Sequence, residues 1–570
     1  MSLRDIAFAK AQRWTQEPFD PKTRAEVTAL LGASDETPVI DRFAEELEFG
    51  TAGLRGVLGV GSAMMNVYTV AQAARGIADA IVQDHPELAG KPVVIGYDCR
   101  LHSDTFAWVC AEVICAAGLQ VLLYDRLGPT PLVPFSIRRH GAAAGIVITS
   151  SHNPKQYNGL KVFAGNGAQI VSPFDKQVSA RIAPWRETPP PRMAVADAVK
   201  GGQLSYLGEE EVSAYLRWVV ETATPRKLNR ARIVYTPLRG TGYDYVARAF
   251  AAAGFDDFHV VPEERDPDPD FGGLSAPNPE RPDVWERSFA LAKSLDADII
   301  LATDGDADRV GVAVPDGAGG FVRLSGNQIG TGMLDYLLAH RQEQGGLDQS
   351  SFAVCSVVSS PLTRAICEGY GIRFHETLTG FKWMGNLVET EVARGQRFVL
   401  AYEEAFGVTF GDSRDKDGLT AILLFAEMAA LAKLQGRSML QGIDALHLRF
   451  GIHLEAGAER FYEGVAGKQV MRELLARLRE QPPAQLAGVE LSSVRDLLSG
   501  QASLPPQDML TFYLRDGAWV SIRPSGTEPK IKAYLGVIRS STAERFEVDK
   551  RAAQTRLDEL HSAVEKMLIA

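Results

Sequence analysis

The chain has 570 residues, a formal net charge of -11 and a hydrophobic content of 45%. The length predicts about four domains, and the composition is typical of a soluble globular protein. The acidic balance argues against a general nucleic-acid-binding protein, and no apolar run approaches the roughly 20 residues that cross a membrane. The first residues lack the hydrophobic segment of a signal peptide, and the five cysteines form no C-x-x-C pair. We therefore expect a cytoplasmic protein with reduced thiols.

Predicted helices and strands alternate over the first part of the chain. Residues 1–40 are expected to be helical, and the glycine-rich segment 49–56, which contains Arg55, lets the backbone approach a ligand closely. The elements that follow are a helix around 68–84, a strand at 93–95, a helix near 103–118, a strand near 120–124 and a strand at 146–148. Strands that alternate with helices indicate an α/β domain with a largely parallel sheet.

The strand at 146–148 runs into a polar loop that includes Ser151 and His152, and Lys161 follows in a second short apolar run. In open α/β sheets, ligands bind at the carboxyl ends of the strands. A serine with a neighbouring base and a cation suits phosphoryl transfer through a covalent phosphoserine. An ordinary turn rich in serine and asparagine is the alternative.

A second α/β unit begins near residue 232, and its strand at 298–301 runs into Asp304, Asp306 and Asp308. Three carboxylates at this spacing repel one another unless a cation holds them, and hard oxygen ligands suit Mg²⁺. An EF-hand is excluded because its sixth position is Arg309 rather than glycine. A solvated acidic turn and an aspartyl nucleophile like that of haloacid dehalogenases remain as alternatives. Residues 263–283, rich in proline and acidic residues, predict a long loop.

A third unit begins near residue 324, and its last strand at 398–400 runs into the pair Glu403 and Glu404. The strand-to-loop segments GIVITSSHN, DIILATDGD and RFVLAYEE form a faint repeat, which predicts three copies of one fold that each bring a loop to a shared cleft. A coincidence of buried strands is the alternative. The remainder reads as a separate α+β module, in which RPSGTEP at 523–529 supplies a guanidinium, two hydroxyls and backbone N–H groups that suit an oxyanion.

Four of these segments together resemble the α-D-phosphohexomutase superfamily. TSSHNPKQYNGLKV resembles its catalytic loop, DGDADR its metal-binding loop, YEEAFG its sugar-binding loop and RPSGTEP its phosphate-binding loop. FGTAGLRG, SHNPKQYNG and YEEAFG are most similar to the subgroup that holds phosphoglucomutase-2 and phosphopentomutase. The chain departs from the usual motifs at Ser150, where the family has alanine, and at Tyr402 and Ala405, which replace glycine and serine.

The resemblance implies three similar α/β domains and a C-terminal α+β domain around a central cleft. The expected domains are 1–205 with the phosphoserine loop, 206–322 with the metal-binding loop, 323–440 with the sugar-binding loop and 441–570 with the phosphate-binding loop. The implied site residues are Ser151, His152, Lys161 and Arg55 for catalysis; Ser151, Asp304, Asp306 and Asp308 for the metal; Glu403, Ala405, Thr379, Gly380, Lys382, Lys416 and Arg309 for the sugar; and Arg523, Ser525, Gly526, Thr527 and Lys532 for the phosphate.

The resemblance also implies a phosphoglucomutase that interconverts glucose 1-phosphate and glucose 6-phosphate. Ser151 would carry the phosphoryl group, with Mg²⁺ as the metal and glucose 1,6-bisphosphate as intermediate and activating donor. Either Lys161 or His152 would handle the hydroxyl proton. We expect a monomer or dimer that binds phosphosugars, but neither nucleic acid nor membrane. The alternatives are phosphopentomutase or phosphomannomutase activity, synthesis of a sugar bisphosphate, and a paralogue that binds phosphosugars without catalysis.

Overall fold

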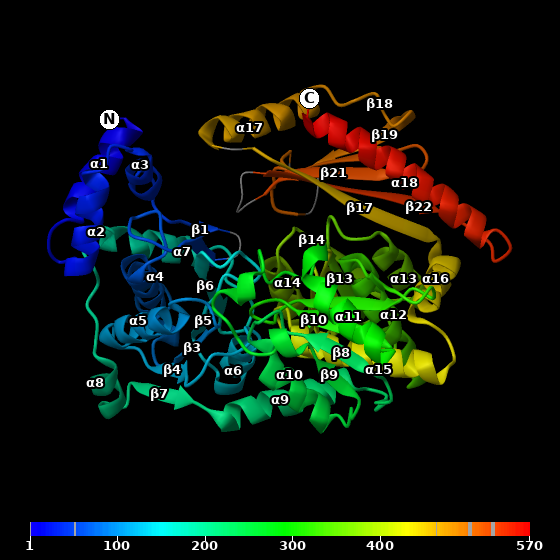
Figure 1. The fold of residues 1–570 in the computed structure, drawn as a ribbon, viewed down its shortest axis with the longest axis horizontal. Helices are drawn as coiled ribbons and strands as arrows, with labels where there is room; N and C mark the ends of the chain where they lie inside the picture. Colours follow the sequence, from blue (N-terminus) through cyan, green and yellow to red (C-terminus); the bar gives the residue numbers. More distant parts are fainter. Residues whose placement is uncertain (1, 51–52, 463, 500–503, 526–529, 570) are drawn as a thin grey trace.

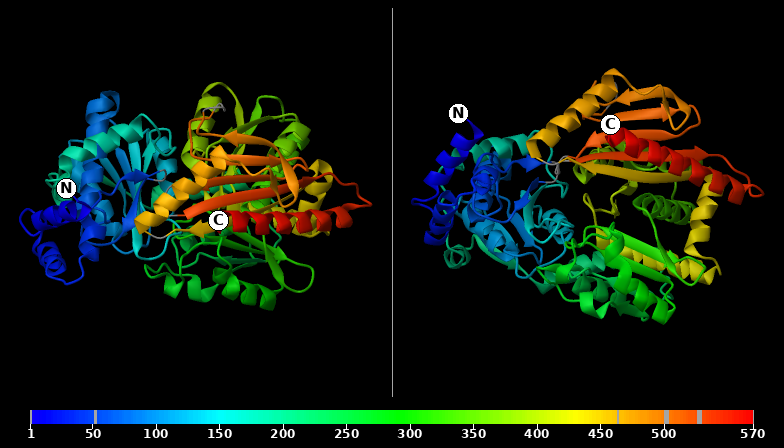
Figure 2. Two further views of the ribbon diagram at one scale, coloured as in Figure 1. Left: turned by 90° about the horizontal axis from the view of Figure 1, so that it is seen from above. Right: turned by 45° about the horizontal axis from the view of Figure 1, so that its top comes forward.

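The computed structural model describes residues 2–50, 53–462, 464–499, 504–525 and 530–569. The described chain forms sheets of seven, five, four and six strands (Figure 1). Helices cover the faces of the first three sheets, whereas the six-stranded sheet stands apart with the C-terminal helix across it (Figures 1 and 2). The predicted four-domain α/β architecture is confirmed.

The helical prediction for the first 40 residues is also confirmed. Helices α1 (Leu3–Arg13), α2 (Pro21–Leu31) and α3 (Thr37–Phe43) pack around Trp14, whose ring stacks on Phe19 with centroids 4.4 Å apart. Ser2 caps α1, and Asp20 caps α2 by accepting hydrogen bonds from the backbone of its first turn.

The first sheet has the order β1-β2-β6-β5-β3-β4-β7. Its strands are β1 (Phe49–Gly50), β2 (Gly53–Val57), β3 (Val93–Tyr97), β4 (Val121–Tyr124), β5 (Ala144–Ile148), β6 (Tyr157–Ala164) and β7 (Leu204–Leu207). Its helices are α4 (Val67–Asp79), α5 (Ser103–Ala116), α6 (Leu132–His140), α7 (Phe174–Ile182) and α8 (Val195–Lys200). Because β7 pairs with β4, this sheet extends two residues beyond the expected limit at residue 205.

The second and third sheets have the orders β12-β11-β10-β8-β9 and β14-β13-β15-β16. Their strands are β8 (Ile233–Thr236), β9 (Phe258–Val260), β10 (Ile299–Thr303), β11 (Val310–Pro315), β12 (Phe321–Arg323), β13 (Ser351–Ser356), β14 (Arg373–Thr377), β15 (Arg397–Glu403) and β16 (Gly407–Phe410). The accompanying helices are α9 (Glu209–Ala223), α10 (Gly242–Ala252), α11 (Glu286–Leu295), α12 (Gly326–Glu343), α13 (Leu362–Tyr370), α14 (Phe381–Ala393), α15 (Gly418–Leu434) and α16 (Met439–Phe450).

The faint sequence repeat corresponds to a repeated topology. Each of the first three sheets contains three neighbouring parallel strands, to which the first sheet adds β7 as a fourth, and the last of the three in sequence is followed by an antiparallel partner. These last strands are β5, β10 and β15, and each pairs with the next strand of the chain, β6, β11 or β16. The three predicted loops therefore occupy equivalent positions, each joining a parallel strand to an antiparallel neighbour.

Helix α15 joins the second and third sheets into one body. It follows β16 in the chain but packs against β10 and β11 of the second sheet and against α9 and α10. Its residues are buried around almost the whole circumference, as expected for an apolar helix in a core. No described helix is by itself long and apolar enough to span a membrane; α15 and α16, which meet at an 89° bend, meet that length and composition test only as a pair.

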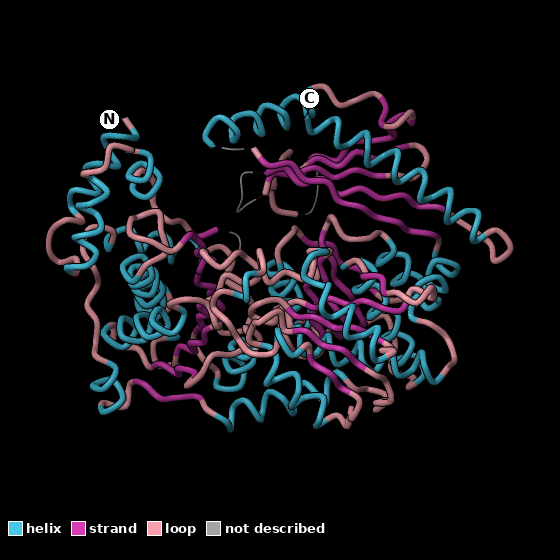
Figure 3. Tube along the Cα trace, in the orientation of Figure 1, coloured by secondary structure: helices cyan, strands magenta, loops and turns pink. Residues whose placement is uncertain are grey.

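The fourth sheet is antiparallel throughout, with the order β17-β22-β21-β20-β19-β18 (Figure 3). Its strands are β17 (Ile452–Phe461), β18 (Gln485–Leu486), β19 (Val489–Asp496), β20 (Leu510–Leu514), β21 (Trp519–Pro524) and β22 (Lys530–Arg539), and its helices are α17 (Gly464–Glu480) and α18 (Phe546–Ile569). This unit has its own hydrophobic core, which confirms the predicted α+β module. Gly451, at a φ of 95°, makes the turn from α16 into β17.

Candidate active site in the central cleft

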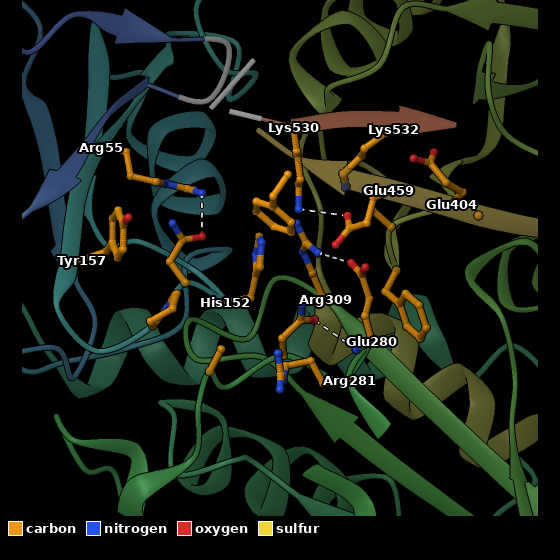
Figure 4. Close-up of a pocket in the computed structure, with 18 of the residues that line it drawn as sticks. Arg55, His152, Tyr157, Glu280, Arg281, Arg309, Glu404, Glu459, Lys530 and Lys532 are labelled. Carbon is orange, nitrogen blue, oxygen red and sulfur yellow. Dashed lines mark hydrogen bonds and ion pairs between the residues drawn. The ribbon is translucent and has the colours of Figure 1, made fainter. Parts of the chain in front are cut away.

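A cavity of about 1790 Å³ lies where residues of all four sheets and the N-terminal segment meet (Figure 4). Of the predicted site residues, five line it: Arg55, His152, Arg309, Ala405 and Lys532. Sequence reasoning missed several polar residues of the same wall, namely Tyr157, Asn278, Glu280, Arg281, Asn327, Glu404, Glu455, Glu459, Lys530 and Tyr534. Most of them lie outside the motifs that the sequence analysis singled out.

The loops after β5, β10 and β15 are tight turns that meet at this cavity. Each contains one non-glycine residue in the left-handed region: Ser151 at a φ of 52°, Ala307 at 54° and Phe406 at 67°. This conformation is uncommon outside glycine, so surrounding contacts must hold it. One such contact links the second loop with the third, because the N–H of Val310 donates to the carbonyl of Phe406 over 3.1 Å.

Ser151 contacts the predicted metal-binding loop directly. Its Oγ donates to Oδ2 of Asp304 over 2.7 Å and lies 3.2 Å from Nδ1 of His152. Ser150 is fully buried, and its hydroxyl has no hydrogen-bond partner among the described residues. The structure therefore brings Ser151, and not Ser150, to the aspartates.

Arg100 fixes the backbone of the serine loop. Its Nη2 donates to the carbonyls of Ser151 and Asn153 over 2.5 and 2.6 Å, and its Nη1 to those of Pro154 and Tyr157 over 3.0 and 3.1 Å. The side chain is itself buried and held by Asp98 at 3.3 Å. A planar guanidinium can satisfy four carbonyls at once, which explains how the loop keeps its strained geometry.

The three aspartates form a buried acidic cluster whose ligand oxygens lie within 4.8 Å of one another. Lys161 donates to Oδ2 of Asp306 over 2.8 Å and to Oδ2 of Asp308 over 2.6 Å, and Lys416 lies 3.5 Å from Asp308. Burial and the neighbouring carboxylates raise the pKa of Asp304 well above its usual range. Burial acts to lower the pKa of Lys161, but Asp306 and Asp308 outweigh it and raise that pKa.

Two oxygens of this cluster fit a bound cation. Oδ1 of Asp306 and Oδ1 of Asp308 are buried and have no hydrogen-bond partner among the described residues. A buried, unsatisfied carboxylate oxygen is costly, so a ligand is expected at this position. Carboxylate oxygens are the donors that Mg²⁺ prefers. The predicted metal-binding loop therefore has the donor set and the free coordination positions of a magnesium site.

Two arginines, Arg55 and Arg309, line the cavity beside His152 of the serine loop. Arg55 donates from Nη1 to the amide oxygen of Asn153 over 3.1 Å, and burial together with Arg100 and Arg309 lowers its pKa to about 10. Burial, followed by Arg309 and Arg55, lowers the pKa of His152 well below its usual range, which keeps the imidazole neutral at neutral pH. Buried arginines close to the serine loop favour an anionic group at this end of the cavity.

The predicted sugar-binding residues fall into two groups. Ala405 lines the cavity beside Glu404, whose Oε2 accepts a hydrogen bond from Ser356 over 3.0 Å. Among the described residues, Glu403 and Lys416 do not line the cavity, and burial raises the pKa of Glu403. The second group, Thr379, Gly380 and Lys382, does not line the cavity among the described residues. Lys382 instead lies 3.8 Å from Asp175 of the first domain.

The predicted phosphate-binding residues are described only in part, because Gly526 and Thr527 lie outside the described residues. Arg523 donates from Nη2 to the hydroxyl of Tyr534 over 3.1 Å, and the N–H of Ser525 donates to the carbonyl of Lys530 over 2.8 Å. Lys532 lines the cavity together with Lys530, which sequence reasoning missed and which pairs with Glu459 at 3.0 Å (Figure 4).

A buried serine hydrogen-bonded to an acidic cluster that could hold a cation, at a cleft between three like sheets and a fourth, fits a phosphoryl-transferring sugar-phosphate mutase. The chain belongs to the phosphoglucomutase/phosphomannomutase family: residues 46–188, 213–318 and 325–446 match its α/β/α domains I, II and III, and residues 472–553 match its C-terminal domain.

Individual relatives carry several mutase names. The chain is 33% identical to a mouse phosphopentomutase, with 99% of this chain and 94% of the relative covered. It is 30% identical to a Staphylococcus epidermidis phosphoglucomutase, covering 88% and 92%. A crystal structure of a phosphoglucomutase/phosphomannomutase family protein from Burkholderia thailandensis shares the fold with a TM-score of 0.66 at 20% identity, covering 90% of this chain and 98% of that one. The protein is thus a phosphotransferase of the isomerase class that acts on phosphosugars.

Replacing Arg100 with lysine is expected to loosen the serine loop. A hydrogen bond to a charged group contributes about 1.5–3 kcal/mol, and about 1.4 kcal/mol changes an equilibrium tenfold. Loss of one or more of the four bonds should therefore raise the rate of tryptic cleavage after Lys155, whose side chain is 53% exposed, about tenfold or more. The rate is measured by limited proteolysis with mass spectrometry. Arg126→Lys, at an exposed arginine, is the control, and equal cleavage of Arg100→Lys and wild type would contradict the assignment.

Proposed function

We propose that the protein is a phosphoglucomutase that interconverts glucose 1-phosphate and glucose 6-phosphate. The observation that carries this proposal is the 2.7 Å hydrogen bond from Ser151 Oγ to Asp304, made at the end of a cleft that is large enough for a phosphosugar. The membership in a mutase family and the free oxygens of Asp306 and Asp308 support it.

In the proposed cycle, Ser151 begins as a phosphoserine. The free hydroxyl of glucose 1-phosphate attacks the phosphorus, the bond from phosphorus to the serine oxygen breaks, and glucose 1,6-bisphosphate forms. The hydroxyl proton leaves to a base of the cleft. The bisphosphate turns over, its other phosphoryl group returns to Ser151, and glucose 6-phosphate is released. Glucose 1,6-bisphosphate would also activate an enzyme whose serine has lost its phosphoryl group.

The geometry favours His152 over Lys161 as the group that handles the proton. His152 lines the cavity and has a ring nitrogen 3.2 Å from Ser151 Oγ. The ammonium of Lys161 donates hydrogen bonds to Asp306 and Asp308, so its protons are already bound by these carboxylates. We assign His152 to proton transfer and Lys161 to charge stabilisation.

We assign Asp304, Asp306, Asp308 and a phosphoryl oxygen on Ser151 to the binding of Mg²⁺, which when bound stabilises negative charge on the transferring group. Arg309 and Arg55 would contact the same phosphoryl group. Arg523, Ser525 and Lys532, with Gly526 and Thr527 of the same loop, would hold the phosphate that is not transferred. Glu403, Ala405 and Lys416 would contact the sugar, and Thr379, Gly380 and Lys382 would join them when the cleft closes.

A pentose 1-phosphate is the second candidate substrate. Ala405 lines the cavity without the hydroxyl that the commoner serine would supply. The most similar curated relatives include phosphopentomutases that are aligned over almost the whole chain. We propose that ribose phosphate is turned over alongside glucose phosphate.

Ser151→Ala is expected to abolish turnover, whereas Ser150→Ala should keep most of it. Only Ser151 Oγ reaches Asp304, while the Ser150 hydroxyl makes no bond among the described residues that its loss would remove. The measurements are mutase rates with glucose 1-phosphate and peptide mass spectrometry after incubation with glucose 1,6-bisphosphate. A phosphate found on Ser150 would refute the assignment.

Activity is expected to require Mg²⁺ at the aspartate cluster. Asp306→Asn should lower kcat by about 100-fold or more and change KM much less, because the ion stabilises charge that develops during transfer. The measurement is a kinetic titration with Mg²⁺, with Asp244→Asn as a matched control at an exposed aspartate. Full wild-type activity in excess chelator would rule out the requirement.

Ala405→Ser is expected to shift specificity towards the hexose. One added hydrogen bond of about 1.4 kcal/mol changes the ratio of kcat/KM values by about tenfold at most. The assay is a competition between glucose 1-phosphate and ribose 1-phosphate, with Ala456→Ser on another part of the cavity wall as control. If the wild type has no pentose activity, or if Ala405→Ser leaves the ratio unchanged, position 405 does not set specificity.

A further inference from the structure

The long loop between β9 and α11, residues 261–285, supplies part of the cavity wall. The proline-rich sequence of this stretch predicts a loop and no site residue, yet Asn278, Glu280 and Arg281 all line the cavity. The loop also packs under the catalytic centre: the ring of Phe271 lies 4.9 Å from the Arg100 guanidinium, and Lys155 of the serine loop pairs with Asp270 at 3.2 Å. The loop is therefore a structural neighbour of both the serine loop and the metal-binding loop.

The backbone around Glu280 is rigidly held. The N–H of Glu280 donates to Oδ1 of Asn278 over 3.0 Å, and its carbonyl accepts a hydrogen bond from Nη1 of Arg323 over 2.9 Å. The residue before it, Pro279, accepts a hydrogen bond at its carbonyl from the buried indole of Trp285 over 2.9 Å. These contacts hold the backbone from which the Glu280 side chain extends.

The carboxylate of Glu280 is directed at Arg309. Oε1 of Glu280 accepts a hydrogen bond from Nη1 of Arg309 over 2.6 Å, and the two side chains are 35% and 12% exposed (Figure 4). The backbone N–H of Arg309 donates to Oδ1 of Asp304, and its Nε lies 3.9 Å from Oδ2 of the same aspartate without a hydrogen-bond partner among the described residues. The guanidinium thus stands beside the aspartate that also holds Ser151.

We propose that Glu280 is a positioning residue that aims the Arg309 guanidinium at the phosphoryl group carried between Ser151 and the sugar. This inference rests on the proposed function. An arginine side chain loses conformational entropy when it is held in one geometry. Because Glu280 already holds Arg309, that entropy is lost before the reaction begins. Glu280 acts through Arg309 and contributes no bond to the reacting atoms.

Two variants separate the geometry of this pair from its charge. Glu280→Gln and Glu280→Ala both remove one negative charge from the cleft, but only glutamine keeps a side-chain oxygen that can accept from Arg309. Glu280→Ala should lower kcat about tenfold to a hundredfold, because small misplacements of a catalytic group cost that much. Glu280→Gln should stay within about threefold of wild type. In both variants KM for glucose 1-phosphate should be unchanged or lower, since the cleft becomes more positive.

The decisive measurement is a double-mutant cycle on kcat with Arg309→Ala. If Glu280 acts through Arg309, adding Glu280→Ala to the Arg309→Ala enzyme should cause no further loss of kcat. Asp283→Ala, which removes another carboxylate of the same loop from its arginine partner, is the matched control and should retain wild-type kcat. Thermal unfolding of each variant shows whether the fold is intact.

The proposal is overturned if Glu280→Ala keeps wild-type kcat, or if its loss of kcat is equally large when Arg309 is already alanine. Failure of the wild type to turn over glucose 1-phosphate or ribose 1-phosphate would count against the proposed function instead. In that case the pair is tested by calorimetry with inorganic phosphate. Glu280→Ala should bind phosphate more tightly than wild type and Arg309→Ala more weakly, and equal affinities would overturn the pairing.

Discussion

The cleft is built around three buried carboxylates that cannot be stable without counter-charges. Asp304, Asp306 and Asp308 are 0–1% exposed and have ligand oxygens within 4.8 Å of one another. Like charges at this separation repel by several kcal/mol in the effective dielectric of a protein. The counter-charges come from elsewhere in the chain: Lys161 lies on β6 of the first sheet, and Lys416 precedes α15. Neutralising the metal-binding loop therefore requires the first three sheets to assemble.

The same requirement explains why the three equivalent loops touch. Thr130, at the start of α6, donates to Asp306 over 2.6 Å, and Ser151 donates to Asp304, so the first sheet satisfies two acceptors of the second. Arg309 forms a backbone bridge to Gly407 of the third loop. Each loop is thus hydrogen-bonded to another domain. These contacts keep the residues with positive φ in their strained backbone conformation.

The sequence could predict the features that depend on local pattern. Apolar strands that end in polar residues located Ser151 and the aspartates, and their alternation with helices indicated the fold. It could not predict features that depend on packing between distant segments. Nothing local to GLTAILLFAEMAALA shows that α15 packs against the second sheet as well as the third, and nothing in the proline-rich stretch shows that Glu280 points at Arg309. The adjacent glutamates Glu403 and Glu404 look alike in sequence, but in the structure Glu404 lines the cavity and accepts a hydrogen bond from Ser356, whereas Glu403 is not among the lining residues.

The turn at Gly451 is the point about which the fourth sheet would rotate relative to the third domain. Strand β17 leaves this glycine and pairs with β22 along its whole length, with Ile452 opposite Arg539 near the turn and Phe461 opposite Lys530 at the far end. Near the turn, Ser360 donates to Glu455, and this hydrogen bond joins the start of β17 to the third domain. Strand β17, from Ile452 to Phe461, is roughly 30 Å long, so a rotation of about 10° at Gly451 would move its far end by about 5 Å. A small rotation at one glycine would therefore displace Lys530 by a distance comparable to the size of a phosphate group.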